Sequence, residues 1–396
     1  GPRPRGPAPS MPPHNPEDLV RLVALYFPQF HAIPENDAWW GEGFTDWVNV
    51  KKARPQFRGH FQPRVPAGGR YYDQSKLETL AWQIDLAKRH GVHAFCHYHY
   101  WFDGKQLLET PTNLVMENRD LDLPFCLAWA NETWSRRWDG RDHHILQQQR
   151  HTPDPELWKR HFDYLYRAWS DDRSLRIDGK PVFLIYRAHL IVELGRMIEC
   201  WREWARERGL PGLYLVAMKQ YEFPVPAVLQ HFDATMQFQP FEALFSPDFP
   251  DDQPLAKKAL TPFRLLPEKI QDLLRAARYQ FFPRLTFYDY EKVWEHIVNL
   301  PEREGGIPAF PGAFVDWDNT ARYVKRARIF KGASPERFDY WFRRLVAATA
   351  NRPHPERLVS LNAWNEWAEG NYLEPDERHG LAYLEAVRDA LAAQGA

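Results

Sequence analysis

The sequence is poor in cysteine: its 396 residues include only Cys96, Cys126 and Cys200, which lie far apart. Three scattered cysteines suggest neither a disulfide framework nor a zinc knuckle, so we expect a reducing compartment and a cytoplasmic location. Apolar runs also stay well short of the roughly 20 residues that a membrane-spanning helix needs. We therefore expect no membrane span.

An excess of charge of one sign is also missing. The chain has 51 Lys and Arg residues against 52 Asp and Glu residues. A protein without a net positive field is not drawn to nucleic acid or to an anionic membrane, so neither is an expected partner. The balance favours a neutral substrate.

Aromatic residues, by contrast, are abundant. They make up 15% of the chain, with 17 tryptophans, and several lie beside Gly, Asn, Asp and Glu rather than inside apolar runs. Aromatic faces near carboxylates suit sugar rings, because the ring surface is apolar and the hydroxyl groups need polar partners. The composition therefore favours a globular protein that binds carbohydrate.

The start of the chain, residues 1–18, is rich in proline and lacks the apolar core of a signal peptide. Gly1-Pro2 resembles the pair of residues that a processing protease leaves behind. We expect this segment to be a disordered tag or linker, and a native leader or neighbouring domain could have been removed with it.

Eight short apolar or aromatic runs recur along the chain, and most precede a longer segment with helical spacing. The runs are residues 22–30, 93–101, 124–131, 181–187, 213–219, 234–239, 312–317 and 358–367, and helices are expected at 76–89, 156–170, 191–208 and 335–350. Near-continuous apolar strands that alternate with helices predict an α/β fold, a single (β/α)8 TIM barrel over residues 19–396. An open doubly wound sheet is disfavoured, because no glycine-rich phosphate loop follows the first run.

Two long segments interrupt this pattern, residues 32–73 after the first strand and residues 241–300 after the sixth. Loops of this length are usually functional or disordered. Residues 241–300 include helical spacing at 267–279 and the aromatic pair Phe281-Phe282. We interpret them as an insertion over the barrel mouth, with a peripheral packing element as the alternative.

The last predicted strand ends with two acids, Glu366 and Glu369, between tryptophans and amides. Chemistry in barrels gathers at the carboxyl ends of strands, and glycosidic cleavage needs a proton donor and a second carboxylate. The walls of Trp364 and Trp367 would raise one acid's proton affinity by desolvation, while Asn365 could hold the other ionised. We predict that Glu366 and Glu369 are the catalytic pair and that their neighbours contact substrate.

The third predicted strand ends in a second Asn-Glu pair beside tryptophan, formed by Trp129, Asn131 and Glu132. Glu132 could bind sugar hydroxyls or serve as the acid partner across the barrel. A salt bridge to Arg136 or Arg137 is its structural alternative. We predict all three residues of the pair to be substrate contacts.

The second predicted strand carries His93, His97 and His99 at even spacing, so their side chains share one face. With Asp103 they could ligate zinc, as in a polysaccharide deacetylase. The neighbouring aromatic residues suit sugar contacts better, so we expect no metal and no cofactor, and assign His97 and His99 to substrate binding. Further residues at strand ends and in the first long loop complete the predicted pocket: Tyr26, Gln29, Trp40, Trp47, Tyr186, Lys219 and Asp316.

Three groups of residues resemble the WbsX-like proteins, a group related to glycoside hydrolase family 99. They are residues 25–47, which include Leu25-Tyr26-Phe27-Pro28-Gln29-Phe30-His31, then Trp129-Ala130-Asn131-Glu132, and Trp364-Asn365-Glu366-Trp367-Ala368-Glu369-Gly370. The resemblance implies a (β/α)8 enzyme that is endo-acting, retains anomeric configuration and needs no metal.

Family 99 has a Glu-Trp-x-Glu-Gly motif, which residues 366–370 match. By this resemblance Glu366 deprotonates the sugar's own 2-hydroxyl, which gives an anhydro-sugar intermediate, and Glu369 acts as general acid and then as base. Ala368 stands where family 99 usually has His, so mannose specificity is not carried over. The expected function is a retaining, endo-acting glycoside hydrolase or transglycosidase on a bacterial surface polysaccharide of the O-antigen or capsule type.

WbsX-like proteins are often labelled glycosyltransferases, so transfer in O-antigen or lipopolysaccharide biosynthesis is the alternative. The nearest acidic motif for a metal-bound diphosphate is Asp316-Trp317-Asp318. A non-catalytic glycan-binding module is a third possibility. Each has an oligo- or polysaccharide as its partner, and the oligomeric state stays open.

Overall fold

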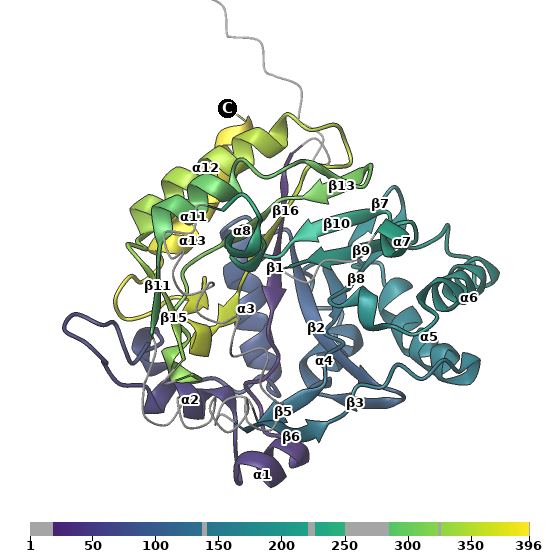
Figure 1. Ribbon diagram of the computed structural model, residues 1–396, viewed down its shortest axis with the longest axis horizontal. Coiled ribbons are helices and arrows are strands. Elements are labelled where there is room, and N and C mark those ends of the chain that lie inside the picture. Colours follow the sequence, from purple (N-terminus) through teal and green to yellow (C-terminus); the bar gives the residue numbers. More distant parts are fainter. Residues whose placement is uncertain (1–18, 137–140, 221–225, 250–284, 324–325, 396) are drawn as a thin grey trace, which may run out of the picture.

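The computed structural model describes residues 19–136, 141–220, 226–249, 285–323 and 326–395. The predicted linker 1–18, the predicted helix 267–279 and Phe281-Phe282 lie outside the described residues. Strands and helices alternate along the chain (Figure 1).

A parallel sheet forms the centre of the molecule. Its strands are β1 (Arg21–Tyr26), β2 (Ala94–Phe102), β4 (Phe125–Trp129), β8 (Lys180–Ile185), β9 (Tyr214–Lys219), β10 (Ala234–Gln237), β13 (Ile307–Phe310), β14 (Gly312–Phe314) and β16 (Leu358–Asn362). They pair in the order β13-β10-β9-β8-β4-β2-β1-β16-β14. Only Pro311 separates β13 from β14, so the two ends of this order are neighbours in the chain.

Each predicted apolar run begins within one residue of an observed strand. Six of the eight predicted runs extend past the carboxyl end of their strand, because residues after strand ends are also apolar or aromatic, whereas the runs at β2 and β9 end within one residue of it. The strand β13 was missed, since Ile307 to Phe310 is short and contains Pro308. Pro308 sits where β13 pairs antiparallel with β12 (Arg303–Glu304).

Both faces of the sheet are buried, which explains the near-continuous apolar strands. One apolar cluster lies between strands and helices and includes Phe95 and Trp101 of β2. The other lies on the opposite face and includes Cys96 and Tyr98 of β2 together with Met218 of β9. Alternation along each strand thus separates a helix-facing side from an inner side.

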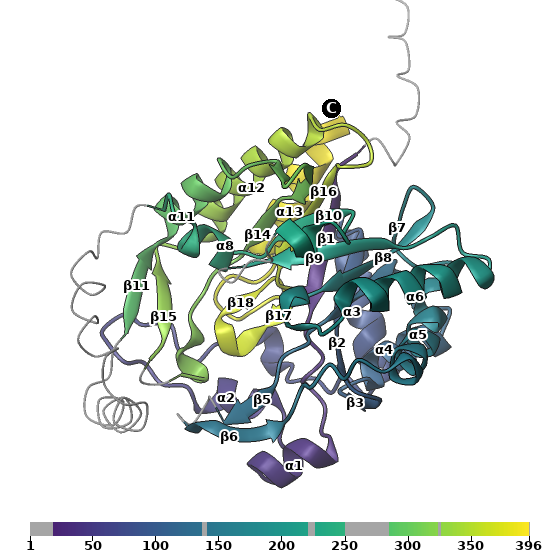
Figure 2. The ribbon, with the colours of Figure 1, turned by 45° about the vertical axis from the view of Figure 1, so that its right-hand side comes forward.

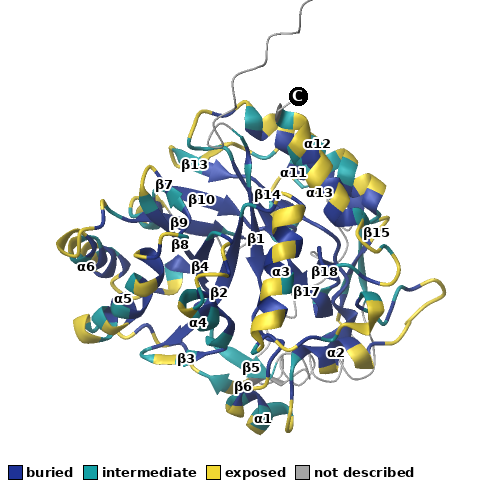
Figure 3. Ribbon diagram, turned by 180° about the vertical axis from the view of Figure 1, so that it is seen from behind, coloured by how far each residue is buried: buried dark blue, intermediate teal, exposed yellow. Residues whose placement is uncertain are grey.

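Helices cover the outer face of the sheet, with buried sides toward the strands and exposed sides outward (Figure 3). They are α3 (Leu77–Arg89), α4 (Thr110–Glu117), α5 (Pro155–Trp169), α6 (Leu194–Glu207), α7 (Pro226–Leu229), α11 (Tyr290–Ile297), α12 (Pro335–Ala350) and α13 (Ala382–Ala392). The predicted helices start at side-chain caps in two cases, Asp154 before α5 and Ser334 before α12.

The loops at the carboxyl ends of the strands carry small elements of their own. These are α1 (Pro34–Trp40), α2 (Asp46–Lys52), β3 (Lys105–Leu107), β5 (Trp134–Arg136), β6 (Arg141–Gln147), α8 (Phe241–Phe245), β11 (Thr286–Asp289), β15 (Arg328–Lys331), β17 (Asn365–Glu366) and β18 (Asn371–Tyr372). The short strand β7 (Arg176–Ile177) lies instead at the amino ends, where it pairs with the start of β8. The α1 helix and the β5–β6 hairpin lie side by side below the sheet (Figures 1 and 2). The extent of the insertion 241–300 stays a prediction.

Candidate active site

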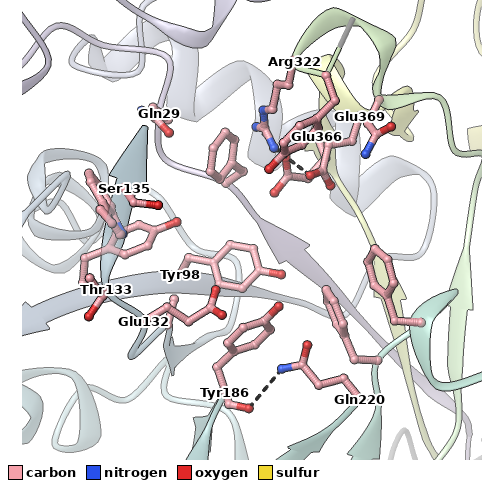
Figure 4. A pocket seen from close by; sticks show the side chains of 18 of the residues that line it. Gln29, Tyr98, Glu132, Thr133, Ser135, Tyr186, Gln220, Arg322, Glu366 and Glu369 are labelled. Carbon is pink, nitrogen blue, oxygen red and sulfur yellow. Dashed lines mark hydrogen bonds and ion pairs between the residues drawn. The ribbon is translucent and has the colours of Figure 1, made fainter. Parts of the chain in front are cut away.

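A pocket of about 510 Å³ opens at the carboxyl ends of the strands. It is lined by residues of β2, of the segments that follow β1, β4, β8, β9, β10, β14 and β16, and of the start of β15. Six predicted site residues line it: Gln29, Trp40, Glu132, Tyr186, Glu366 and Glu369. Figure 4 shows Glu366 and Glu369 on one side of this pocket and Glu132 and Tyr186 on the other.

Glu366 and Glu369 are brought to the same wall by a tight reversal of the chain. Residues Asn365 and Glu366 form β17, which pairs antiparallel with β18, and one short 3-10 turn separates the two acids. Gly370 ends that turn at φ 64°, where a Cβ atom would lie 3.0 Å from the backbone nitrogen of Asp318. The glycine of the motif is therefore required by the turn and by this close approach.

Arg322 holds the two acids together. Its Nη2 lies 3.1 Å from Oε2 of Glu366 and its Nη1 lies 2.7 Å from Oε1 of Glu369. The same Nη2 lies 2.7 Å from Oδ2 of Asp46, whose side chain is fully buried. One guanidinium therefore serves three carboxylates in a nearly closed space.

This arrangement shifts the acidity of the pair. Burial and the neighbouring Glu369 raise the pKa of Glu366 well above its usual range, against the opposing effect of Arg322. Burial also raises the pKa of Glu369, again opposed by Arg322. The pair therefore favours keeping a proton, as a general acid must near neutral pH.

Asn365, Trp364 and Trp367 position the acids from behind the pocket. The side chain of Asn365 accepts a hydrogen bond from the Phe27 nitrogen at 2.8 Å and donates one to the Phe27 oxygen at 2.9 Å. Trp364 is fully buried in the helix-facing cluster, and Trp367 donates to Glu374 at 2.7 Å. These three residues do not line the pocket, so their predicted contact with substrate is corrected to a supporting role.

Asn131 and Trp129 have the same supporting position on the other side. Asn131 accepts a hydrogen bond from the Arg187 nitrogen and donates one to the Arg187 oxygen. Trp129 is buried and donates to the Trp101 oxygen at 3.1 Å. Of these three residues only Glu132 lines the pocket, where it forms an ion pair with Arg187 rather than with Arg136. Arg137, the other predicted partner, lies outside the described residues.

His97 and His99 do not reach the pocket, because they point to the helix-facing side of β2. His97 contacts the Thr112 hydroxyl at 3.2 Å, and His99 contacts His161 at 2.8 Å. The described part of the chain contains no group of three or more His, Cys, Asp and Glu residues that could hold a metal ion. Tyr98 and Tyr100, which alternate with these histidines along β2, face the pocket instead.

Four further predicted contacts are also engaged elsewhere. The Tyr26 hydroxyl donates to Gln83, and Trp47 donates to the Tyr72 oxygen. Lys219 pairs with Glu242 and Glu304 beside the pocket. Asp316 pairs with Arg64, and its neighbour Asp318 pairs with His60, so the acidic motif around Trp317 turns its carboxylates away from the pocket.

Several pocket residues were missed from the sequence. They include Phe27, Asn36, Gln220, Phe238, Phe241, Asn319, Arg322 and Arg328, together with Asp46 behind the acid pair. Strand alternation alone could have separated Tyr98 and Tyr100 from the histidines. Nothing near Arg322 in the sequence indicates its partners, which are far away along the chain.

Two of the solved structures that this fold resembles are described as glycosidase or glycosidase-like proteins. An endo-α-mannosidase of family 99 from Bacteroides thetaiotaomicron aligns with a TM-score of 0.51 and 13% identity over 95% of this chain and 97% of that one. A glycoside hydrolase-like protein aligns with a TM-score of 0.54 and 12% identity over 98% and 97%. The protein therefore has a glycosidase-like α/β fold.

The family follows from the sequence. The chain belongs to the family described as glycosyltransferase WbsX, whose family model matches residues 22–387. It is 39% identical over 388 residues to the uncharacterized protein WxcX of Xanthomonas campestris pv. campestris strain B100, covering 95% of this chain and 50% of that protein. The chain thus spans about half the length of the curated relatives that it matches. None of its described helices is both long and apolar enough to cross a bilayer.

Proposed function

We propose that the protein is a retaining, endo-acting glycoside hydrolase or transglycosidase that acts on a bacterial surface polysaccharide. The proposal rests on one observation above the others: Glu366 and Glu369 share Arg322 at the wall of a pocket whose lining includes many aromatic and amide side chains. A buried pair of acids beside an aromatic cavity supplies the proton donor and the second carboxylate that glycosidic cleavage needs. Counting β13 and β14 as one strand, we infer a closed (β/α)8 barrel around it.

The two acids are proposed to have different roles. Glu366 deprotonates the sugar 2-hydroxyl, which then attacks the anomeric carbon from within the same sugar ring. Glu369 protonates the leaving oxygen and then activates water or an acceptor hydroxyl. Side-chain exposure supports this order, since Glu369 is 18% exposed against 9% for Glu366, and the acid–base group must reach the leaving group and the water.

Asn36 is proposed as a further substrate contact. It lies on α1, is 1% exposed and lines the pocket, yet neither its side-chain oxygen nor its nitrogen has a hydrogen-bond partner among the described residues. An unpaired buried amide is costly unless a ligand completes it, and vicinal sugar hydroxyls can bond both atoms.

The test is a screen of intact O-antigens and capsular glycans with product analysis, run with wild type and with Glu369→Gln. We expect wild type to shorten at least one glycan internally and the variant to leave it intact. NMR of the first product should show the anomeric configuration of the substrate. A product of inverted configuration, or equal cleavage by the variant, would contradict the proposal.

The family's description favours a glycosyltransferase as second candidate. It predicts metal-dependent binding of a nucleotide sugar. Against it, the Asp316 and Asp318 carboxylates are taken by Arg64 and His60. Calorimetry with UDP-sugars in the presence and absence of Mn²⁺ separates the two candidates.

A further inference from the structure

Arg328 places a positive charge in the pocket, outside the acid pair. It is the first residue of β15 and lines the pocket. Its backbone nitrogen donates to the Asn319 side chain at 2.8 Å, and the next residue, Ile329, bridges to Asp318. Because the Asp318 nitrogen also donates to the Glu369 oxygen at 2.7 Å, Arg328 is tied to the loop that meets the acids.

The side chain of Arg328 rests on aromatic rings. Its guanidinium carbon lies 6.0 Å from the ring centre of Phe241 and 5.5 Å from that of Phe245. Phe241 stacks nearly parallel to Phe238 and meets Trp317 edge to face at 4.8 Å. The pocket therefore has an aromatic wall with a cation at its edge.

Arg328 differs from the two arginines that pair with pocket acids. Arg322 pairs with Glu366 and Glu369, and Arg187 pairs with Glu132. Arg328 is half-buried and has no carboxylate within ion-pair distance in the ranges that the structure describes. A partly desolvated cation without a counter-charge is unfavourable unless a ligand supplies one.

A guanidinium that lies over a ring keeps its in-plane N–H groups open. Those groups match the two oxygens of a carboxylate or phosphate, while the aromatic wall takes the apolar face of a sugar. The even net charge of the chain favours a neutral substrate, but that balance averages over the whole surface. The charge at this wall is local and positive.

We propose that the glycan bound here is acidic, with a sugar-borne oxyanion paired to Arg328. This inference rests on the proposed function, because it names the substrate class of the same pocket. It does not require cleavage, so binding alone can test it.

Binding is measured by calorimetry in the Glu369→Gln background, which prevents turnover. The probes are surface oligosaccharides that contain hexuronic acid, each paired with its carboxyl-reduced counterpart. We expect at least tenfold tighter binding of an acidic member than of its reduced form. Adding Arg328→Gln should abolish this preference, and Arg328→Lys should keep part of it.

Lys331→Gln is the matched control. Lys331 lies on the same strand, over the Phe287 ring and outside the pocket, and its loss changes the net charge equally. It should leave the preference intact. An equal loss in this control, equal binding of the reduced forms, or binding of no acidic member overturns the inference.

A second arm distinguishes the sources of the oxyanion. Phosphate-bearing oligosaccharides that bind through Arg328 support the inference with phosphate as the group. Binding of free UDP that needs Arg328, without binding of any acidic glycan, overturns it. If neutral glycans bind and wild type cleaves them, the proposed function stands and this inference fails. If acidic glycans bind through Arg328 but none is cleaved, this inference stands and the proposed function fails.

Discussion

The ends of β4 and β16 carry the same dipeptide, Asn-Glu, and use its first residue in the same way. Asn131 bonds both the nitrogen and the oxygen of Arg187, just past the end of β8, and Asn365 bonds both groups of Phe27, just past the end of β1. In each case a side-chain amide takes the place of a strand partner and ties one strand end to the next.

The second residues differ. Glu366 is buried with Glu369, Asp46 and a single shared arginine, whereas the Glu132 side chain is 28% exposed and has Arg187 as an ion-pair partner. Burial and like charge raise the pKa of Glu366. The difference teaches that the local backbone fixes where such a glutamate sits, and that distant residues decide its acidity.

The largest expected effect comes from replacing the glutamates. Glu366→Gln and Glu369→Gln should each lower kcat by about 10³-fold, since general acid–base groups contribute about 10²- to 10⁴-fold. Glu132→Gln should instead raise KM, with a fall in kcat of less than about tenfold. Steady-state kinetics on a glycan from the screen measures both constants. An equal loss of kcat at Glu132 would make it the acid partner and break the comparison.

The arginines should differ in stability. Arg322→Met leaves three buried carboxylates without a cation and should lower the free energy of unfolding by about 3–5 kcal/mol. Arg187→Met leaves a carboxylate that reaches solvent, and should cost about 1 kcal/mol. Urea denaturation at pH 8 measures both. At pH 5 the Arg322→Met deficit should shrink as the acids take up protons, while equal losses would contradict the asymmetry.

Glu374 should give the β16 side a pH dependence that the β4 side lacks. Burial raises its pKa from the ordinary 4.5 to about 7, although Trp367, Gln83 and Tyr72 donate hydrogen bonds to it. The folded state therefore favours the protonated form, so its contribution is complete below pH 4.5 and is lost as the pH rises through 7.

Relative to Glu374→Gln, wild type should lose about 3 kcal/mol of unfolding free energy between pH 4.5 and pH 8. The variant is a fair reference, because rotation of the Gln83 amide restores a donor–acceptor match. Denaturation of both proteins across this range measures the difference. Parallel curves would show that Glu374 is ionised throughout.

The strands were predictable because each is a short apolar run with both faces buried, which leaves a clear signal in the sequence. The acid pair was predictable for a related reason, since Glu366 and Glu369 lie within one motif at a strand end. What failed was the direction of individual side chains: His97 and His99 share the strand with Tyr98 and Tyr100 but face the helices.

Residues whose role depends on distant partners could not be found from the sequence. Arg322 meets Asp46 across 276 positions, and Asn36 matters because nothing pairs with it in the described fold. The tryptophans of the two motifs were wrongly predicted to contact substrate because they lie next to the glutamates in sequence. Trp129 and Trp364 instead fill the layer between the sheet and the helices, which needs large apolar side chains at those places.

The smallest expected effect concerns the feature that the two strand ends share, the hydrogen bonds between an asparagine side chain and a neighbouring backbone. Asn131→Ala and Asn365→Ala each leave one buried backbone N–H group without its acceptor, that of Arg187 or that of Phe27. The two C=O groups keep a second donor, which is the Leu190 nitrogen for Arg187 and the Gln74 side chain for Phe27. Because an unsatisfied buried group costs about 1–3 kcal/mol, each variant should lose about 2 kcal/mol of unfolding free energy, and the two losses should agree within about 0.5 kcal/mol.

Asn299→Ala is the control, since the Asn299 side chain is exposed and donates to the Glu295 oxygen near the end of α11. It should cost less than about 0.5 kcal/mol. The two amides also differ in what they support. Asn365 directly precedes Glu366, so its loss should lower kcat, whereas Asn131 directly precedes Glu132, so its loss should raise KM. The comparison requires equal losses of unfolding free energy but different changes in kcat and KM. The two asparagines make the same backbone contacts, whereas the glutamates that follow them have different surroundings.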